Sequence, residues 1–246
     1  MKVKEYTKMF QLEQSHWFFI CKRMFIAAFI KKFPLKRGSL IFDAGCGAGA
    51  NHLFLENYGK VVSLDISPDA IRYCQKRNLS GLIQADLNRF NFKKSSFDMA
   101  AALDVLYHSW IQDDQALLNQ FYHILKPGGR LLLTDSAFQL LVSRHDKAVM
   151  TRERYTIPKL REKLKEAGFT IQRSSYMFFT TFPLLVMVRF LQKFSRAEED
   201  AESNLFPLPL WVNKMILGIM KIEALLLSWI PLPFGSSVII LAEKPE

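Results

Sequence analysis

A glycine-rich loop that follows an apolar strand constrains this chain more than any other feature. Residues 40–42, Leu-Ile-Phe, are typical of a buried strand, and they run directly into the loop Asp43-Ala44-Gly45-Cys46-Gly47-Ala48-Gly49. Three alternating glycines allow a tight turn and let a ligand approach main-chain atoms at the carboxyl end of the strand. A helix is expected to begin near Ala50. The loop therefore predicts a strand–loop–helix unit of the nucleotide-binding type.

The middle of the chain continues this alternation of strand and helix. Helical periodicity covers residues 113–125 and 158–167, and Ser67-Pro68-Asp69 is typical of a helix start. The alternation favours βαβ units and a parallel sheet, so a single α/β domain is expected for 246 residues. Apolar and β-branched runs predict strands at Ser39–Asp43, Lys60–Asp65, Gly81–Ala85, Phe97–Leu103, Arg130–Ser136, Phe169–Met177 and Ser237–Ala242.

Two further segments flank the core, which spans residues 38–177. Residues 1–37 are predicted to form an N-terminal helical cap. Residues 178–235, rich in Phe, Leu, Met and Pro, are predicted to form a helical insertion before the last strand at 236–246. The apolar stretch 211–230 in this insertion contains Lys214, Lys221 and Glu223. Each such charge costs about 2.5–3.5 kcal/mol at mid-bilayer, so this stretch is not expected to span a membrane.

Acidic residues follow three successive strands. Asp43 lies two residues before the first glycine, Asp65 ends the second strand and Asp86 follows the third. The loop formally satisfies the dinucleotide pattern GxGxxG/A, so a nicotinamide-binding Rossmann protein is one alternative. However, a carboxylate can accept both ribose hydroxyls and suits a cationic group better than a pyrophosphate. Three strand-end acids, with no basic residue in the loop, therefore favour a nucleoside without phosphate.

The same motifs resemble, in order, those of the class I S-adenosylmethionine-dependent methyltransferases. They are DAGCGAG at 43–49, Asp65, Gln84-Ala85-Asp86, Phe97-Asp98 and Leu125-Lys126-Pro127-Gly128-Gly129. The small-molecule "type 11" subgroup is the most similar, because its members often carry a segment like His16-Trp17-Phe18-Phe19. The resemblance covers residues 38–177, although the run 46–50 is unusually apolar. It implies a Rossmann-like, seven-stranded, mostly parallel sheet with an antiparallel terminal hairpin, S-adenosyl-L-methionine as cofactor and no metal.

The resemblance also implies roles for individual residues. Asp43 and the backbone of 45–47 would hold the methionine part of the cofactor, Asp65 the ribose, and Asp86 the adenine. The complete set of expected cofactor-binding residues is Asp43, Gly45, Cys46, Gly47, Asp65, Ile66, Asp86, Leu87, Leu103 and Asp104. Leu103 and Asp104 would line the sulfonium.

Methyl transfer from a sulfonium is an in-line displacement in which the enzyme mainly positions the nucleophile, with an optional general base. His108 follows strand four and His145 follows strand five, so both are candidate bases. Capping of a helix by His108, and a surface pair of His145 with Asp146, are the alternatives. Residues expected at the substrate or in a lid over the cofactor are His16, Trp17, Arg23, Tyr107 and Tyr155. Core packing is the alternative role for His16, Trp17 and Tyr155.

Charge is concentrated at the N-terminus. The chain has 33 Lys+Arg and 23 Asp+Glu, and residues 1–37 alone hold nine bases and two acids. Such a surplus favours anionic partners, so an RNA methyltransferase is a second alternative. The bases are interleaved with apolar helix positions and no RNA-binding module is evident, so no nucleic-acid partner is expected. Three cysteines without CxxC spacing predict neither a disulfide framework nor a zinc site and favour the cytoplasm.

The apolar insertion bears on the acceptor. Its two helical stretches are expected to pack on the sheet, to form a hydrophobic lid over the substrate, or to dock on lipid as an interfacial helix. Basic residues beside apolar helices fit an anionic or hydrophobic small molecule, or a membrane surface, better than a nucleic-acid groove. We therefore expect methyl transfer to a small, largely apolar or lipid-like acceptor. The protein is expected to be cytoplasmic, and docking of the insertion on lipid would add a peripheral membrane contact.

Overall fold

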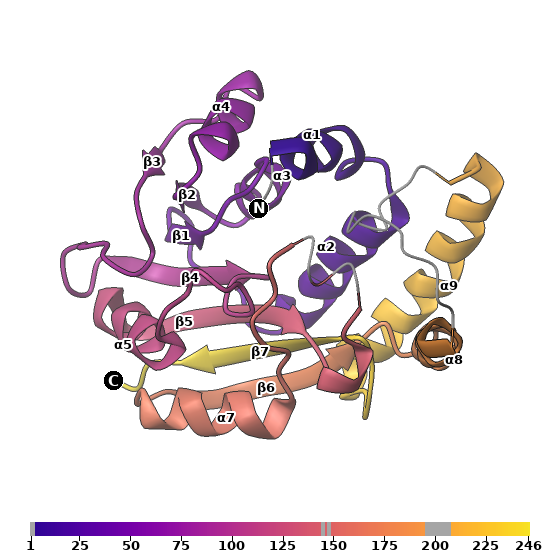
Figure 1. The fold of residues 1–246 in the computed structure, drawn as a ribbon. Coiled ribbons are helices and arrows are strands. Elements are labelled where there is room, and N and C mark those ends of the chain that lie inside the picture. Colours follow the sequence, from indigo (N-terminus) through magenta and orange to yellow (C-terminus); the bar gives the residue numbers. More distant parts are fainter. Residues whose placement is uncertain (1–2, 144–145, 147–148, 195–207) are drawn as a thin grey trace.

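A computed structural model of the chain describes residues 3–143, 146, 149–194 and 208–246 (Figure 1). Its sheet has seven strands in the order β3-β2-β1-β4-β5-β7-β6. All neighbouring pairs are parallel except β5–β7 and β7–β6, so the antiparallel part lies at one end, as predicted. The strands are β1 (Leu40–Ala44), β2 (Lys60–Asp65), β3 (Leu82–Gln84), β4 (Phe97–Leu103), β5 (Leu125–Ser136), β6 (Thr170–Met177) and β7 (Ser237–Glu243).

The helices begin where the capping residues predicted. The side chains of Ser67 and Asp113 accept hydrogen bonds from the N–H groups of Ala70 and Ala116, and they cap α4 and α5. The described helices are α1 (Val3–Leu12), α2 (Trp17–Ile30), α3 (Ala50–Leu55), α4 (Pro68–Lys76), α5 (Asp114–Ile124), α7 (Ile157–Glu166), α8 (Phe182–Phe194) and α9 (Leu210–Trp229), with the 3-10 turn η1 at Gln139–Leu141. The expected insertion thus provides α8 and α9 between β6 and β7.

Apolar residues cover both faces of the sheet. On one face, α5 and α7 pack Phe121 and Leu160 against β5 and β7. On the other face, α2, α3 and α9 pack Phe25, Leu55 and Leu227 against β1, β4 and β7. The result is a three-layer α/β arrangement, with α5 and α7 in front of the sheet in Figure 1 and α2 behind it. Strand-end residues are therefore left for the site, as expected for an open parallel sheet.

Two polar contacts dock α9 onto α2. The backbone N–H of Trp17 donates to Asn213 Oδ1 at 2.9 Å. The guanidinium of Arg173 donates to the carbonyls of Phe29 and Leu227 and lies over the Phe29 ring, 4.6 Å from its centroid. The insertion is therefore held against the N-terminal helices by hydrogen bonds between residues that are far apart in the sequence.

Candidate functional site

The carboxyl ends of four neighbouring strands bring the predicted acids to one edge of the sheet. Because β3, β2, β1 and β4 are adjacent and parallel, the residues at their carboxyl ends share this edge. Asp43 lies in β1, Asp65 ends β2, Asp86 follows β3 and Asp104 follows β4. The sheet order therefore gathers residues that the sequence separates by up to sixty positions. We call this set the acidic edge.

The glycine loop uses its own N–H groups inside the protein. Gly45 and Cys46 donate to the carbonyl of Leu64 at 2.7 and 3.1 Å, and Gly47 donates to Asp65 Oδ2 at 3.0 Å. Gly45 and Gly47 have positive φ values of 75° and 55°, which a residue with a side chain rarely adopts. A phosphate at this loop would need those N–H groups as donors, and they are already bonded.

Glu13 occupies the N-terminus of α3. Its carboxylate lies near the Ala50 N–H, at the start of α3, and accepts a hydrogen bond from Arg77 Nη2 at 2.7 Å. Burial raises the pKa of Glu13 to about 7, against the opposing effect of Arg77. A dinucleotide fold places the pyrophosphate at this helix N-terminus. Because an acid is already there, the loop fits a ligand without phosphate, as the strand-end acids predicted.

Asp65 is buried under the first helix. Its two oxygens accept hydrogen bonds from Gly47 N–H and, at 2.9 Å, from Ser67 N–H. Burial raises its pKa, while these N–H donors oppose the rise. The side chain of Tyr6 lies beside it and hydrogen-bonds Ser67. Each carboxylate oxygen has a second lone pair, so Asp65 can still accept from a diol.

Asp43 lies at the end of a buried hydrogen-bond chain. Ser63 Oγ donates to Asp43 Oδ2 at 2.8 Å and lies 2.7 Å from His52 Nδ1. Burial raises the pKa of Asp43 to about 7, and the neighbouring Asp65 adds to the rise, although the Ser63 hydroxyl opposes it. A cation nearby would favour the ionised carboxylate. The chemistry of this residue thus suits an ammonium group.

Asp86 and two apolar residues, Ile66 and Leu87, are also part of the predicted site. Asn88 donates to Asp86 Oδ1 through its N–H at 2.9 Å and its side-chain amide at 2.7 Å. Leu87 is buried, whereas Ile66, beside Asp65, is 45% exposed. An apolar side chain open at this edge, next to acceptors on either side, is a suitable surface for an aromatic base.

Lys22 of α2 reaches the end of β4 and pairs with Asp104 Oδ2. The lysine is only 7% exposed, and Leu103 beside the aspartate is also buried. Asp104 Oδ1 and the neighbouring Asp135 Oδ2 are buried and have no hydrogen-bond partner among the described residues. Burial and the proximity of Asp104 hold the pKa of Asp135 well above its usual range. The acidic edge thus ends in a buried polar group that combines one cation with two carboxyls.

Residues 42–133 match a family model that is described as a methyltransferase domain. This region is a methyltransferase domain. The matched family is the type 11 group, as the motifs predicted. The seven-stranded sheet with its antiparallel end is also the fold of a solved S-adenosylmethionine-dependent methyltransferase from Mesorhizobium loti, with a TM-score of 0.58 at 16% identity.

The methyltransferase domain is similar in sequence to two kinds of curated enzyme. Phosphoethanolamine N-methyltransferase 3 of Arabidopsis thaliana is 30% identical over 152 residues, which are 57% of this chain and 31% of that protein. Ubiquinone biosynthesis O-methyltransferase of Xylella fastidiosa (strain 9a5c) is 32% identical over 124 residues, which are 46% of this chain and 49% of that protein. The matched part is thus about a third of the plant enzyme and half of the bacterial one.

Solved structures extend the likeness beyond the methyltransferase domain. A chain from the complex between the Haloferax volcanii Trm112 methyltransferase activator and its methyltransferase has a TM-score of 0.64 and 17% identity, covering 99% of this chain and 95% of that one. Haemonchus contortus phosphoethanolamine N-methyltransferase 2, crystallised with phosphomonomethylethanolamine and S-adenosylhomocysteine, has a TM-score of 0.57 and 18% identity, covering 90% and 53%. At these identities the likeness establishes the fold alone.

The N-terminal residues predicted as a lid lie near the methyltransferase domain but point elsewhere. His16 caps α2 and accepts from the Phe18 N–H through Nδ1 at 3.3 Å. Trp17 packs edge-to-face on Phe178, with ring centroids 6.1 Å apart. Arg23 donates to the Glu13 carbonyl at 2.6 Å, so it belongs to the turn between α1 and α2. The element that covers the glycine loop is α1, from which Met9 approaches Gly47.

His108 lies after β4, at the carboxyl edge. Its Nδ1 lies 3.0 Å from the Val149 carbonyl, so Nδ1 must carry the proton and Nε2 is left as an acceptor. Burial lowers the pKa of His108 to about 4, so the ring is neutral at pH 7. Its ring contacts those of Tyr107 and Trp110, with centroid distances of 4.2 and 4.8 Å and tilts of 36° and 31°. Burial, with Asp104 and Asp135 nearby, keeps the pKa of Tyr107 well above its usual range.

Tyr155, another predicted residue, is not brought to the site. Tyr155 has no exposed surface, and its hydroxyl donates to Asp114 Oδ2 at 2.7 Å and accepts from Arg152 at 3.0 Å. Those bonds use its polar atom, so the structure gives Tyr155 a packing role beneath the site. His145 lies outside the described residues. Its neighbour Asp146 accepts a two-pronged contact from Arg154 at 2.8 and 3.1 Å.

Four residues of the site were missed by reasoning from sequence: Tyr6, Met9, Glu13 and Lys22. The first three had no local signal, because their contacts are with segments about forty to sixty residues further along. Lys22 had a weak one, since a lysine on an otherwise apolar helix face is buried only when it is paired.

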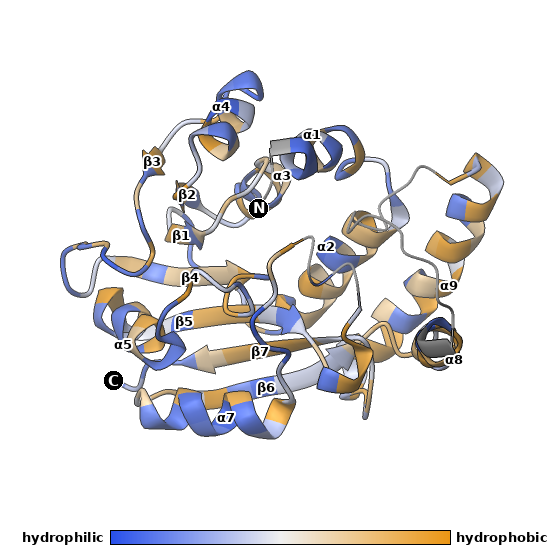
Figure 2. Ribbon diagram, in the orientation of Figure 1, coloured by the Kyte–Doolittle hydropathy of each residue, from blue (hydrophilic) through white to orange (hydrophobic). Residues whose placement is uncertain are grey.

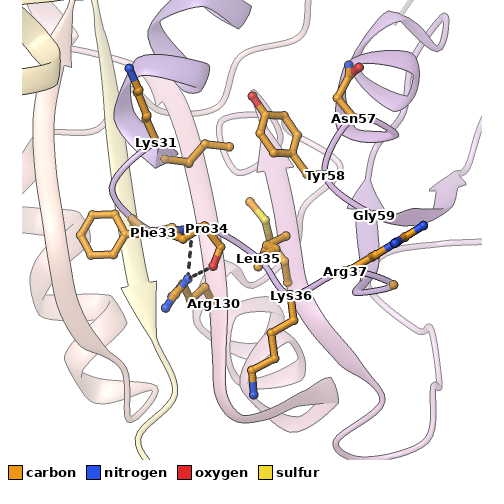
Figure 3. A pocket seen from close by; sticks show the side chains of 14 residues that line it. Lys31, Phe33, Pro34, Leu35, Lys36, Arg37, Asn57, Tyr58, Gly59 and Arg130 are labelled. Carbon is orange, nitrogen blue, oxygen red and sulfur yellow. Dashed lines mark hydrogen bonds between the residues drawn. The ribbon is translucent and has the colours of Figure 1, made fainter.

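A basic hollow lies at the opposite edge of the sheet (Figure 3). It has a volume of about 540 Å³ and is rimmed by Lys31, Lys36 and Arg37, with Tyr58 on one side. Arg130 donates there to the carbonyls of Phe33 and Pro34 at 3.0 and 3.4 Å. It lies at the amino ends of the strands, away from the acidic edge, so it takes no part in the site described above.

Proposed function

We propose that this chain transfers a methyl group from S-adenosyl-L-methionine to a small, largely apolar or lipid-like acceptor by in-line displacement. The observation that carries the proposal is the Asp65 carboxylate bonded to the Gly47 N–H, with the Glu13 carboxylate beside the N-terminus of α3. A pyrophosphate would need that N–H group as a donor and would meet two carboxylates there. A nicotinamide dinucleotide is therefore disfavoured, and a nucleoside with a cationic tail is favoured.

The cofactor residues follow from the chemistry of the acidic edge. Asp65 is suited to the ribose hydroxyls, Asp86 to an amino group of the adenine, and Asp43 to the ammonium of the methionine part. The bound sulfonium supplies the activated methyl group. Gly45, Cys46 and Gly47 shape the loop on which this ligand would lie, with Ile66 and Leu87 beside the base. Asp104, neutralised in part by Lys22, would face the positive sulfur.

The protein's part in the reaction is mainly to position the acceptor and to exclude water. In the proposed site, α1 covers the loop, and the aromatic residues Tyr107 and Trp110 lie after β4. His108 is the candidate base, because its Nε2 can accept a proton while its Nδ1–H donates to the Val149 carbonyl. With a pKa near 4 it is a weak base, which is sufficient when the acceptor loses its proton only after methyl transfer.

An apolar acceptor is supported by the surroundings of the N-terminal helices. Phe18 stacks on Phe178 with ring centroids 5.1 Å apart, and Trp17 and Phe25 contact the same ring edge-on. This aromatic cluster joins α2 to the insertion. The two kinds of relative named above include one whose name refers to ubiquinone biosynthesis. RNA is less well supported, since Lys22 and Arg23 of the basic N-terminus pair internally.

The test is methyl transfer from radiolabelled S-adenosyl-L-methionine to matched acceptors. Each pair carries the same accepting group, once on a long hydrocarbon chain and once on a short polar one. We expect the long-chain member of a pair to have the higher kcat/KM, and Asp65→Ala to abolish transfer to both. If only short polar acceptors are methylated, the acceptor class is wrong although the reaction is right. If no acceptor is methylated while the cofactor binds, the proposed activity fails.

A further inference from the structure

The outward face of α9 is apolar. Nine of its large apolar side chains, or those just after it, are exposed: Leu210, Trp211, Met215, Ile219, Ile222, Leu225, Leu226, Trp229 and Ile230. They recur every three or four residues and so form one continuous stripe. Helices on a protein surface normally have the reverse pattern, with polar residues facing water. We call this stripe the α9 outer face.

Two polar residues of α9, Asn213 and Glu223, face inward instead. Glu223 is buried and accepts hydrogen bonds from the N–H groups of Phe179 and Thr180 at 2.8 and 3.0 Å and from the Thr180 hydroxyl at 2.6 Å. Asn213 is bonded to Trp17 and, through its amide, to the Ser15 carbonyl at 3.1 Å. These bonds fix the rotation of α9, so its apolar stripe is held outward by the fold.

A second helix enlarges the surface. On α8 the side chains of Leu184, Met187, Val188 and Leu191 are also exposed, with Leu184 and Leu191 both at 59%. Both helices lie at the same edge of the molecule in Figures 1 and 2. Contiguous exposed apolar patches beyond a few hundred Å² are rare on monomeric proteins and mark binding surfaces. So many exposed apolar side chains on two helices at one edge of the molecule (Figure 1) call for a covering partner.

The charges around the surface have one sign. The charged side chains exposed on α9 are Lys214 and Lys221. At its end, Lys32, which follows α2, lies over the Trp229 ring, 5.3 Å from the centroid, and Lys31 beside it is exposed. Within the described residues 178–194 and 208–236 the one acid is Glu223, which is buried. Four acids of the sequence between the two helices, in residues 198–202, lie outside the described part.

Two further features of the helices indicate the kind of partner that covers this surface. Trp211 and Trp229, near the two ends of α9, are 70% and 72% exposed, and tryptophan prefers the boundary between hydrocarbon and headgroups. Neither α9 nor any other described helix is long and apolar enough to cross a membrane. An apolar helix face flanked by lysines and tryptophans, without a span, is the pattern of a helix that lies in the membrane interface.

We infer that the outer faces of α8 and α9 dock on an anionic phospholipid surface, with α9 lying in the plane of the interface. Lysines at its flank contact the headgroups, and the apolar stripe enters the acyl boundary. The inference concerns binding and holds whether or not methyl transfer occurs. If the proposed function is correct, docking also brings the start of α2, which is bonded to Asn213, next to the layer that holds lipid-like acceptors.

The test is co-sedimentation of the full chain with vesicles of phosphatidylcholine, with and without phosphatidylglycerol. We expect the wild type to bind the vesicles that contain phosphatidylglycerol. The variant Lys214→Glu/Lys221→Glu should bind these vesicles about tenfold or more weakly, since each lysine near an anionic surface contributes about fivefold to the affinity. The matched control is Arg161→Glu/Lys165→Glu on α7, which makes the same change of charge on another helix and should bind as the wild type. A triple variant, Trp211→Ser/Ile222→Ser/Trp229→Ser, should lose binding to the vesicles that contain phosphatidylglycerol.

All these positions are exposed, so thermal melting of each variant should match that of the wild type, which separates docking from folding. Absence of binding to phosphatidylglycerol vesicles overturns the inference. So does equal binding by the wild type and the α9 variants. The alternative partner for the α9 outer face is a second copy of this chain, and size-exclusion chromatography tests for it. If the wild type is a dimer and the triple variant is a monomer, the face is a dimer interface, which contradicts lipid docking.

Discussion

Lys22, in the middle of α2, forms a buried ion pair with Asp104 at the end of β4, although the two residues are 82 positions apart. The pair ties the N-terminal helical segment to the acidic edge of the methyltransferase domain. It also places a cation against two neighbouring carboxyl groups, Asp104 and Asp135, one of which is fully buried. The N-terminal segment is therefore part of the site and not an appendage to it.

Replacement of Lys22 by methionine should destabilise the protein. Removing one partner of a buried pair leaves the other charge without compensation, which costs about 3–5 kcal/mol when both are fully buried. The Asp104 side chain is 29% exposed, so we expect a loss of about 2–3 kcal/mol in the free energy of unfolding. Urea denaturation measures it. The control is Lys31→Met, at an exposed lysine, and an equal loss in both variants would contradict the assigned role.

The pair of Arg77 with Glu13 should matter more than the pair of Arg72 with Asp69, although both join an arginine of the α4 region to an acid. Arg77 and Glu13 side chains are 9% and 5% exposed, and their atoms are 2.7 Å apart. Arg72 is 68% exposed and lies 3.4 Å from Asp69. Arg77→Met should therefore lower the free energy of unfolding by about 3 kcal/mol, and Arg72→Met by less than about 1 kcal/mol. Similar losses of free energy in the two variants would show that burial does not decide the strength of these ion pairs.

Cofactor affinity should depend on pH through Asp43. Burial raises the pKa of this carboxyl to about 7, so below that pH it is increasingly protonated and loses its attraction for an ammonium group. The Kd for S-adenosyl-L-methionine should therefore rise by about tenfold as the pH falls from about 8 to about 6. Calorimetric titration at each pH measures it. In Asp43→Asn the affinity should be weaker throughout and this part of the pH dependence absent; an unchanged profile in the variant would remove Asp43 from the site.

His108 should contribute only modestly to the rate. Its pKa of about 4 means that the imidazole is neutral at the working pH and is a weak base. We expect His108→Gln to lower kcat by about tenfold, below the usual range for a matched general base, and to remove no limb of the pH–rate profile between about pH 5.5 and pH 9. Cofactor affinity should be unchanged. A limb near neutral pH that disappears in the variant would show that the ring titrates in the enzyme and would contradict the burial argument.

The sequence was sufficient to predict the sheet and the gathering of acids at one edge of it, because both depend on local patterns. Short apolar runs predicted six strands to within one residue and β5 except for its first five residues, and Ser67 and Asp113 cap helices where their types predict. Asp43 and Asp65 were identifiable because a strand end followed by a turn places a side chain at the edge of the sheet. These features need no knowledge of which distant segments pack together.

The contacts of the N-terminal segment could not be predicted in the same way. Nothing near Glu13 in the sequence indicates that it reaches α3, and Lys22 looked like one more base in a basic segment. Such pairs are decided by how α1 and α2 pack on the sheet, which is a tertiary property. The choice between substrate contact and core packing for Tyr155 could not be made from the sequence for the same reason, since only the structure shows Asp114 in reach of its hydroxyl.

The central claim is that the acidic edge binds S-adenosyl-L-methionine and not a dinucleotide, and calorimetric titration of the purified chain with S-adenosyl-L-methionine and with NAD tests it most directly. We predict a Kd of roughly micromolar order for the first and no measurable binding of the second. In Asp65→Ala the affinity should fall by about thirtyfold or more, since charged hydrogen bonds to the ribose are lost. Asp69→Ala, four residues on in α4, is the control and should bind as the wild type. Unchanged binding in Asp65→Ala, or binding of NAD with similar affinity, would contradict the account.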